Sequence, residues 1–179
     1  MRFPTIVLLG AFCAASPALA QQVGTYTGTT QDGSAVTIVV ATDPNTSKLE
    51  VKTISFDVDM LCQKSMETLS DVGIGLGDGF DIAGDGTFSY ATSGFFDIDL
   101  VTSMTFKGTK SVKGKVGANL AAFVPAIGHT KLTNKVQPCV SATQPFTATF
   151  SGADVSRTLP AGMLSIHGPD GTATIRREN

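Results

Sequence analysis

The chain has 179 residues, with 13 Lys and Arg against 15 Asp and Glu and a formal net charge of -2 at pH 7. This balance excludes a strongly basic protein that would bind nucleic acid through its overall charge, so we expect no nucleic-acid partner. The 19 glycines, the frequent threonines and serines and the absence of tryptophan exclude long helices and favour short strands with tight turns, because β-branched residues suit pleated sheets.

Residues 1–20 have the pattern of a secretory signal peptide. An arginine stands near the start, residues 6–15 are almost wholly apolar, and an Ala-Leu-Ala sequence at 18–20 fits a cleavage site. The apolar stretch is shorter than the ~20 residues that a bilayer-spanning helix needs. We therefore expect a secreted or periplasmic protein with no membrane span, in which residues 21–179 form a single domain.

The first segment after the leader, residues 24–40, predicts a β-hairpin. Valine and isoleucine at the even positions from 36 to 40 share one face, at the two-residue period of a strand. The Asp32-Gly33 pair favours a two-residue turn between the two strands.

A third strand is expected after the Asp-Pro-Asn turn at 43–45. Its apolar residues fall on odd positions up to Val51 and on even positions from Ile54 onward. Because the inward face changes between them, the pattern predicts a β-bulge or a tight bend near Lys52-Thr53.

The middle of the chain is less regular. Residues 61–69 predict one short helical turn, and residues 70–86 predict a loop because they are rich in Gly and Asp. Residues 87–91 predict a return to strand.

Alternating apolar residues recur in the second half. They occupy residues 94–108, as one strand or as two joined near 102–103, then residues 116–124 and residues 146–150. Residues 163–176 predict a last hairpin around a Gly-Pro-Asp-Gly turn. In all, about eight to ten short strands are expected, which is typical of a single antiparallel β-sandwich or, alternatively, of a β-barrel.

Cysteine usage predicts one disulfide. Cys13 leaves with the leader, and the two that remain, Cys62 and Cys139, are most simply joined in an exported chain. The competing interpretation is a metal site that adds His129 and His167, but their spacing fits no familiar zinc motif.

Five short motifs stand out along the chain. They are the turn-glycine opening that starts at Gly24, the Gly-Asp-Gly-Thr-Phe motif that ends at Phe88, the Lys-Gly-Lys-Val strand at 113–116, the cysteine pair, and the Phe-Thr-Ala-Thr-Phe strand at 146–150. Together these motifs resemble those of small bacterial secreted β-sandwich domains. The resemblance spans about residues 24–151. It implies a β-sandwich and a disulfide, and it assigns no catalytic residue.

The glycine-rich stretch from 73 to 86 is a candidate calcium loop, because carboxylates among turns can wrap oxygen ligands around the ion. Asp78, Asp81 and Asp85 are the candidate ligands. The spacing does not match an EF-hand, and the alternative is a surface loop whose aspartates cap turns.

Two acidic pairs occupy alternate strand positions, Asp57 with Asp59 and Asp97 with Asp99. Paired carboxylates hydrolyse glycosidic bonds when they face each other across a sugar. Both pairs lie opposite the apolar stripe, however, where solvated carboxylates keep a sheet soluble.

Four lysines lie within nine residues, Lys107, Lys110, Lys113 and Lys115. Such a patch can hold an anionic polymer, a lipid surface or phosphate groups. The alternative is a solvated strand face whose lysines discourage edge-to-edge aggregation.

Together these observations predict an exported, non-catalytic interaction or structural module of the cell envelope or the extracellular space. Its partner would be an anionic envelope polymer or another envelope protein. One alternative is a hydrolase of polysaccharide or another envelope polymer that uses the acidic pairs, and another is an adhesive module stabilised by calcium.

Overall fold

The computed structural model describes residues 21–62, 66–76, 80–95, 98–120, 139–156, 158–160, 163–168 and 171–176. The expected leader, residues 1–20, lies outside these residues, and so do Cys13, His129, Asp78 and Asp97. Within the described part of the chain there is no helix, so the expectation of an all-β protein is confirmed. Accordingly, these residues include no helix of the length and apolar character needed to cross a bilayer.

The strands follow the chain with short connections. They are β1 (Gly24–Thr30), β2 (Ala35–Thr42), β3 (Leu49–Cys62), β4 (Met66–Gly75), β5 (Thr87–Phe95), β6 (Ile98–Lys107), β7 (Ser111–Leu120), β8 (Cys139–Val140), β9 (Gln144–Gly152), β10 (Met163–Gly168) and β11 (Gly171–Arg176).

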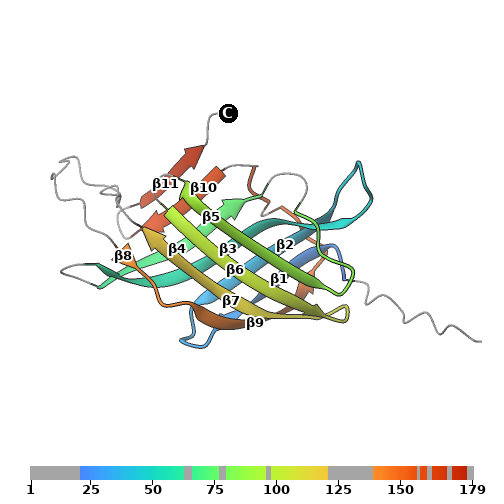
Figure 1. Ribbon diagram of the computed structural model, residues 1–179, viewed down its shortest axis with the longest axis horizontal. Coiled ribbons are helices and arrows are strands. Elements are labelled where there is room, and N and C mark those ends of the chain that lie inside the picture. Colours follow the sequence, from blue (N-terminus) through green and yellow to red (C-terminus); the bar gives the residue numbers. More distant parts are fainter. Residues whose placement is uncertain are drawn as a thin grey trace, which may run out of the picture.

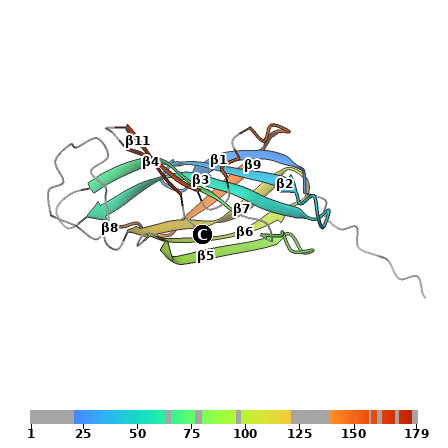
Figure 2. The same cartoon turned by 90° about the horizontal axis from the view of Figure 1, so that it is seen from above.

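These strands form one 11-stranded sheet, with the order β11-β10-β4-β3-β2-β1-β9-β7-β6-β5. The sheet curls into a half-barrel, with β1 to β4 on one side and β5 to β7 on the other (Figures 1 and 2). β9 carries the sheet around the bend, because it pairs with β1 and with β7. The short β8 bridges the two sides at one end by pairing with β3 and β7. A sandwich of two separate sheets is not confirmed, since one hydrogen-bonded path joins the strands.

The N-terminal hairpin is confirmed, with a longer turn than expected. β1 pairs antiparallel with β2 from Gly24 opposite Val40 to Thr29 opposite Ala35. The Thr30 N–H then donates to the Ser34 carbonyl at 2.8 Å, so three residues rather than two form the turn. Gly33 has a φ of 92° there, a conformation that glycine adopts without Cβ strain.

The expected bulge in the third strand is also confirmed. Val39 pairs with Thr53, whereas the next residue, Val40, pairs with Val51. Lys52 is therefore the extra residue on β3, and it allows Val51 and Ile54 to face the core although their positions differ in parity.

The expectations for residues 61–86 are partly wrong. The helical turn at 61–69 is not formed, because β3 extends to Cys62 and β4 begins at Met66. Residues 70–75 are strand rather than loop, since β4 continues to Gly75 between β3 and β10. The C-terminal hairpin is confirmed, with Gly168 opposite Gly171, and it adds β10 and β11 to the β4 edge.

The core lies between the two sides of the half-barrel. Tyr26 is fully buried in it, and its ring packs edge-on against Phe106 at 5.3 Å and Phe150 at 5.4 Å between centroids. The Tyr26 hydroxyl donates a hydrogen bond to the Gln22 carbonyl at 3.1 Å. Burial raises the pKa of Tyr26 above its usual value, because the phenolate would lose its hydration.

Candidate functional site

The outer face of β5, β6 and β7 carries two parallel rows of polar side chains. The first row consists of Thr87, Thr105 and Lys113, which are direct partners on neighbouring strands. The second row is two residues along each strand and consists of Ser89, Ser103 and Lys115. The rows face outward because the alternate positions Phe88, Met104 and Val112 are buried.

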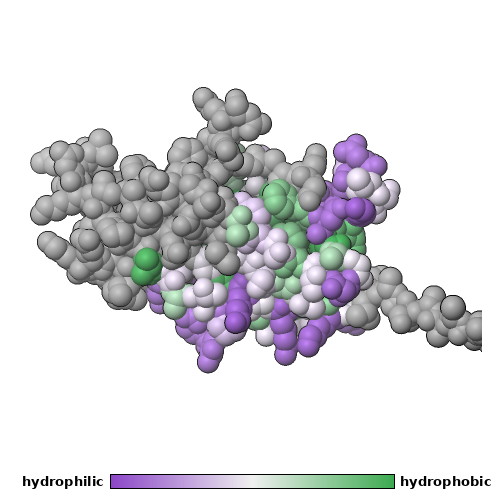
Figure 3. Space-filling view, in the orientation of Figure 1, coloured by the Kyte–Doolittle hydropathy of each residue, from purple (hydrophilic) through white to green (hydrophobic). Residues whose placement is uncertain are grey.

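A shallow groove of about 710 Å³ runs between these rows. Its lining includes Phe88, Met104 and Gly114, which are direct partners on β5, β6 and β7 and lie between the two polar rows. Asp81 and Ala83, from the loop before β5, also line the groove. Figure 3 shows the same side of the molecule as Figure 1, and pale to purple residues predominate over β6 and β7. The groove thus mixes polar and apolar surface, and its lining carries two cationic side chains, Lys113 and Lys115, and the carboxylate of Asp81.

The four lysines of the expected patch are all exposed, but the structure divides them into two pairs. Lys113 and Lys115 line the groove. Lys107 ends β6 and Lys110 lies in the turn before β7, and neither lines the groove. Sequence reasoning does not identify the serine and threonine partners of the lysines, although the alternation along β5 and β6 carries that signal.

The groove can donate and accept hydrogen bonds and can neutralise negative charge. Each lysine ammonium offers three donors, and each hydroxyl is both a donor and an acceptor. Lys113 and Lys115 are two positions apart on one strand, so their Cα atoms are about 6.8 Å apart. A ligand that carries anions together with hydroxyls matches this set.

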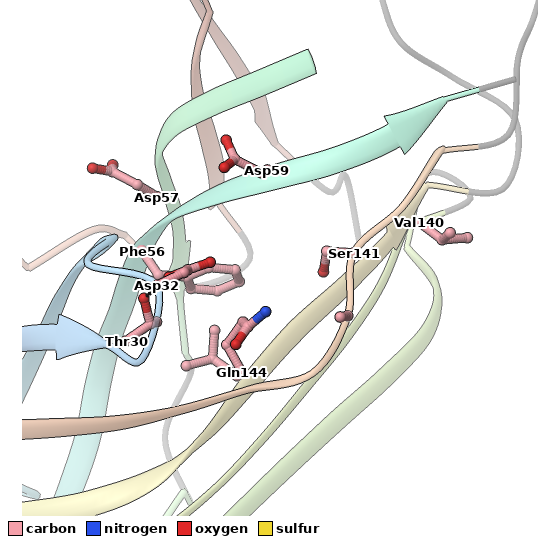
Figure 4. Close-up of a pocket in the computed structure, with 10 residues that line it drawn as sticks. Thr30, Asp32, Phe56, Asp57, Asp59, Val140, Ser141 and Gln144 are labelled. Carbon is pink, nitrogen blue, oxygen red and sulfur yellow. Dashed lines mark hydrogen bonds between the residues drawn. The ribbon is translucent and has the colours of Figure 1, made fainter. Parts of the chain in front are cut away.

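A second cavity, of about 530 Å³, opens beside β8. Its lining residues are Thr30, Asp32, Phe56, Asp57, Asp59, Val116, Val140, Ser141, Ala142 and Gln144. Figure 4 shows Phe56 and Gln144 directed into the cavity, whereas Asp57 and Asp59 leave β3 on the side away from the Phe56 ring. The two aspartates therefore lie at its rim and do not converge on a common point inside it.

The second acidic pair is not brought to this rim. Asp97 lies outside the described residues. The backbone of Asp99 on β6 pairs with Asn119 on β7, Asn119 pairs with Val140 on β8, and Val140 pairs with Leu61 on β3. Three strand spacings, about 14 Å along the sheet, thus separate the Asp99 backbone from β3. Glycosidases hold their two carboxyl groups at about 5–9.5 Å, so the register does not favour a catalytic combination of the two pairs.

The expected calcium ligands also separate. Asp78 is outside the described residues, and Asp85 caps a turn by accepting hydrogen bonds from the Thr87 N–H at 2.9 Å and the Thr87 hydroxyl at 2.6 Å. These bonds hold the pKa of Asp85 below its usual value. Asp81 lies instead beside Asp43 and Glu50, two residues that the glycine-rich pattern does not indicate because they come from another part of the chain.

Asp32, which also lines the second cavity, accepts hydrogen bonds from residues of its own turn. The hydroxyl of Thr30 donates to Asp32, and this bond lowers the pKa of Asp32. Asp32 is thus stabilised as an anion by its own turn.

Comparison of the chain with protein families, with curated proteins and with solved structures finds no match.

Proposed function

We propose that the protein is an exported, non-catalytic binding module that holds an anionic polymer of the cell envelope or the extracellular space along the outer face of β5, β6 and β7. The observation that carries this proposal is the groove of about 710 Å³ in which Lys113 and Lys115 lie beside four hydroxyl-bearing side chains. The carboxylate in its lining, that of Asp81, is paired with Lys48 at 2.7 Å.

The composition of the groove favours a polymer over a small apolar ligand. Its rows follow the strand register across three strands, which gives an extended and shallow surface, whereas small-molecule sites are concave and mostly apolar. Anionic groups would pair with the two ammonium groups, and neutral hydroxyls of a sugar would bond to the serines and threonines.

A disulfide between Cys62 and Cys139 belongs to this proposal, because an exported protein encounters oxidising conditions. The backbone register supports it, since Cys62 of β3 is the direct antiparallel partner of Cys139 of β8. Such partners have Cα atoms about 4.5–5.5 Å apart, within the usual range of about 4.4–6.8 Å for disulfides. The bond would tie β3 to the strand that also pairs with β7.

The direct test measures the affinity of the full chain for polygalacturonate, a polymer of sugar acids, at low salt. We expect binding that weakens steeply as salt is added, because the ions screen exposed charges. Replacing Lys113 and Lys115 together with Gln should weaken binding about 30-fold, since each lysine near an anionic surface contributes about 1 kcal/mol.

The matched control replaces Lys107 and Lys110 with Gln, which removes the same charge from exposed positions that do not line the groove. This variant should bind almost as tightly as the original chain, and neutral dextran should bind to neither. Equal losses in the two double variants would show that net charge, and not the groove, is responsible. No binding to polygalacturonate or to polyphosphate at low salt would refute the proposal.

A further inference from the structure

A second cluster of charged side chains lies where two loops meet β3. Asp43 begins the turn between β2 and β3, Glu50 is on β3, and Asp81 is in the loop before β5, where it forms an isolated bridge with Glu50. Each of the three offers one carboxylate oxygen, and these oxygens lie within 4.8 Å of one another. Backbone hydrogen bonds keep the segments together, including the Ile82 N–H to the Leu49 carbonyl at 2.8 Å.

The cluster holds more negative than positive charge. Lys52 Nζ is 2.5 Å from Glu50 Oε1, and Lys48 Nζ is 2.7 Å from Asp81 Oδ2. Three carboxylates thus face two ammonium groups. Lys48 neutralises less of the negative charge than Lys52 does, because the Lys48 side chain is 63% exposed and water screens its charge.

Glu50 provides a second, independent observation that points to a ligand. Its exposure is 0%, and its Oε2 is buried with no hydrogen-bond partner. Asp81 Oδ1 is likewise buried and has no hydrogen-bond partner. A buried anionic oxygen without a partner is costly, so two such oxygens on members of one cluster point to a cation as their ligand.

We propose that Asp43, Glu50 and Asp81 form a binding site for a divalent cation of the calcium type. The ligands are all carboxylate oxygens, which calcium and magnesium prefer over the nitrogen and sulfur ligands of zinc. Three oxygens that lie within 4.8 Å of one another can share one ion, because one point lies within about 2.8 Å (4.8/√3) of all three. Calcium suits such a set better than magnesium, because calcium accepts flexible geometry at about 2.3–2.6 Å whereas magnesium needs near-ideal octahedral geometry at about 2.0–2.1 Å.

The site differs from the glycine-rich loop that the sequence indicates. Only Asp81 is common to both sets of residues. Asp43 comes from the β2–β3 turn, where its carboxylate accepts hydrogen bonds from the Asn45 N–H and the Thr46 hydroxyl, each at 2.7 Å. These bonds orient the Asp43 carboxylate, and its oxygens keep further lone pairs for a metal. The cation would join the β2–β3 turn to the loop before β5.

The test uses the full chain, treated with EDTA and then titrated with CaCl2 or MgCl2, with melting temperature and calorimetric stoichiometry as readouts. We expect one calcium per chain and a raised melting temperature. At free calcium 100 times the dissociation constant, the folding equilibrium constant should rise about 100-fold. Magnesium should give a clearly smaller shift.

Glu50→Gln and Asp81→Asn should each weaken calcium binding at least tenfold, measured by calorimetry on folded protein. Asp85→Asn is the matched control, because Asp85 is an exposed carboxylate outside the cluster, and it should bind calcium as the original chain does. Two variants are used so that the loss of folding in one leaves the other to decide. No calcium binding at millimolar concentrations, an equal effect of magnesium, or an equal loss in Asp85→Asn would overturn the assignment.

Discussion

At the scale of single residues, Gly28 shows how closely two strands can approach. It lies on β1 opposite Ala148 of β9, and a Cβ at this position would overlap the carbonyl oxygen of Thr147 and come within 2.5 Å of the Ala148 Cα. Both contacts are with backbone atoms, which cannot move aside as a flexible side chain can. A side chain at position 28 would therefore force β1 away from β9.

We expect Gly28→Ala to lower the free energy of unfolding by about 1–3 kcal/mol, the usual cost of overpacking a well-packed region. Urea denaturation of the purified variant measures this change. Gly84→Ala is the matched control, because a Cβ at Gly84 meets no atom within 4 Å. Similar stabilities of the two variants would contradict the close approach of β1 and β9.

At the scale of strands, local patterns predict the elements whose partners are near in sequence. The β1–β2 hairpin and the β10–β11 hairpin each join neighbouring segments, and alternation together with turn residues is enough to indicate them. The bulge at Lys52 was also predictable, because the apolar residues change from odd to even positions between Val51 and Ile54, and this change can be read from the sequence.

β4 was not predictable in the same way. Its sequence, METLSDVGIG, contains two glycines, two acidic residues and little alternation, so its intrinsic preference for strand is weak. It becomes a strand because β3 and β10 pair with it on either side. Non-local hydrogen bonding of this kind leaves no short-range signal.

The two candidate sites also differ in how far the sequence predicts them, because one lies on a single strand and the other joins distant segments. Lys113 and Lys115 share a strand, so their common outward face follows from parity. Asp43, Glu50 and Asp81 meet only because the loop before β5 returns to β3. A sequence pattern cannot show that encounter, and the glycine-rich loop indicated Asp81 together with Asp78 and Asp85 instead.

At the scale of the whole molecule, the proposed disulfide connects residues far apart in the chain. A bond between Cys62 and Cys139 would close a loop of nearly 80 residues, which in the chain-entropy model stabilises the protein by at most about 4–5 kcal/mol. Its position beside β8 would strengthen the bridge between the two sides of the half-barrel.

We expect reduction with TCEP to lower the melting temperature of the mature protein markedly. Thiol titration under denaturing conditions should find no reactive thiol before reduction and two afterwards. The double variant Cys62→Ser and Cys139→Ser should melt near the temperature of the reduced protein and should not respond to TCEP. Two reactive thiols in protein purified without reductant would contradict the proposed bond.

The proposed binding surface is the groove over β5, β6 and β7. The most direct measurement records backbone amide NMR shifts of the isotope-labelled chain as polygalacturonate is added at low salt. We expect the largest changes at Thr87, Ser89, Ser103, Thr105, Lys113 and Lys115, with little change around the cavity beside β8 or near Lys107 and Lys110. Changes centred on that cavity, or spread evenly over the surface, would contradict the claim.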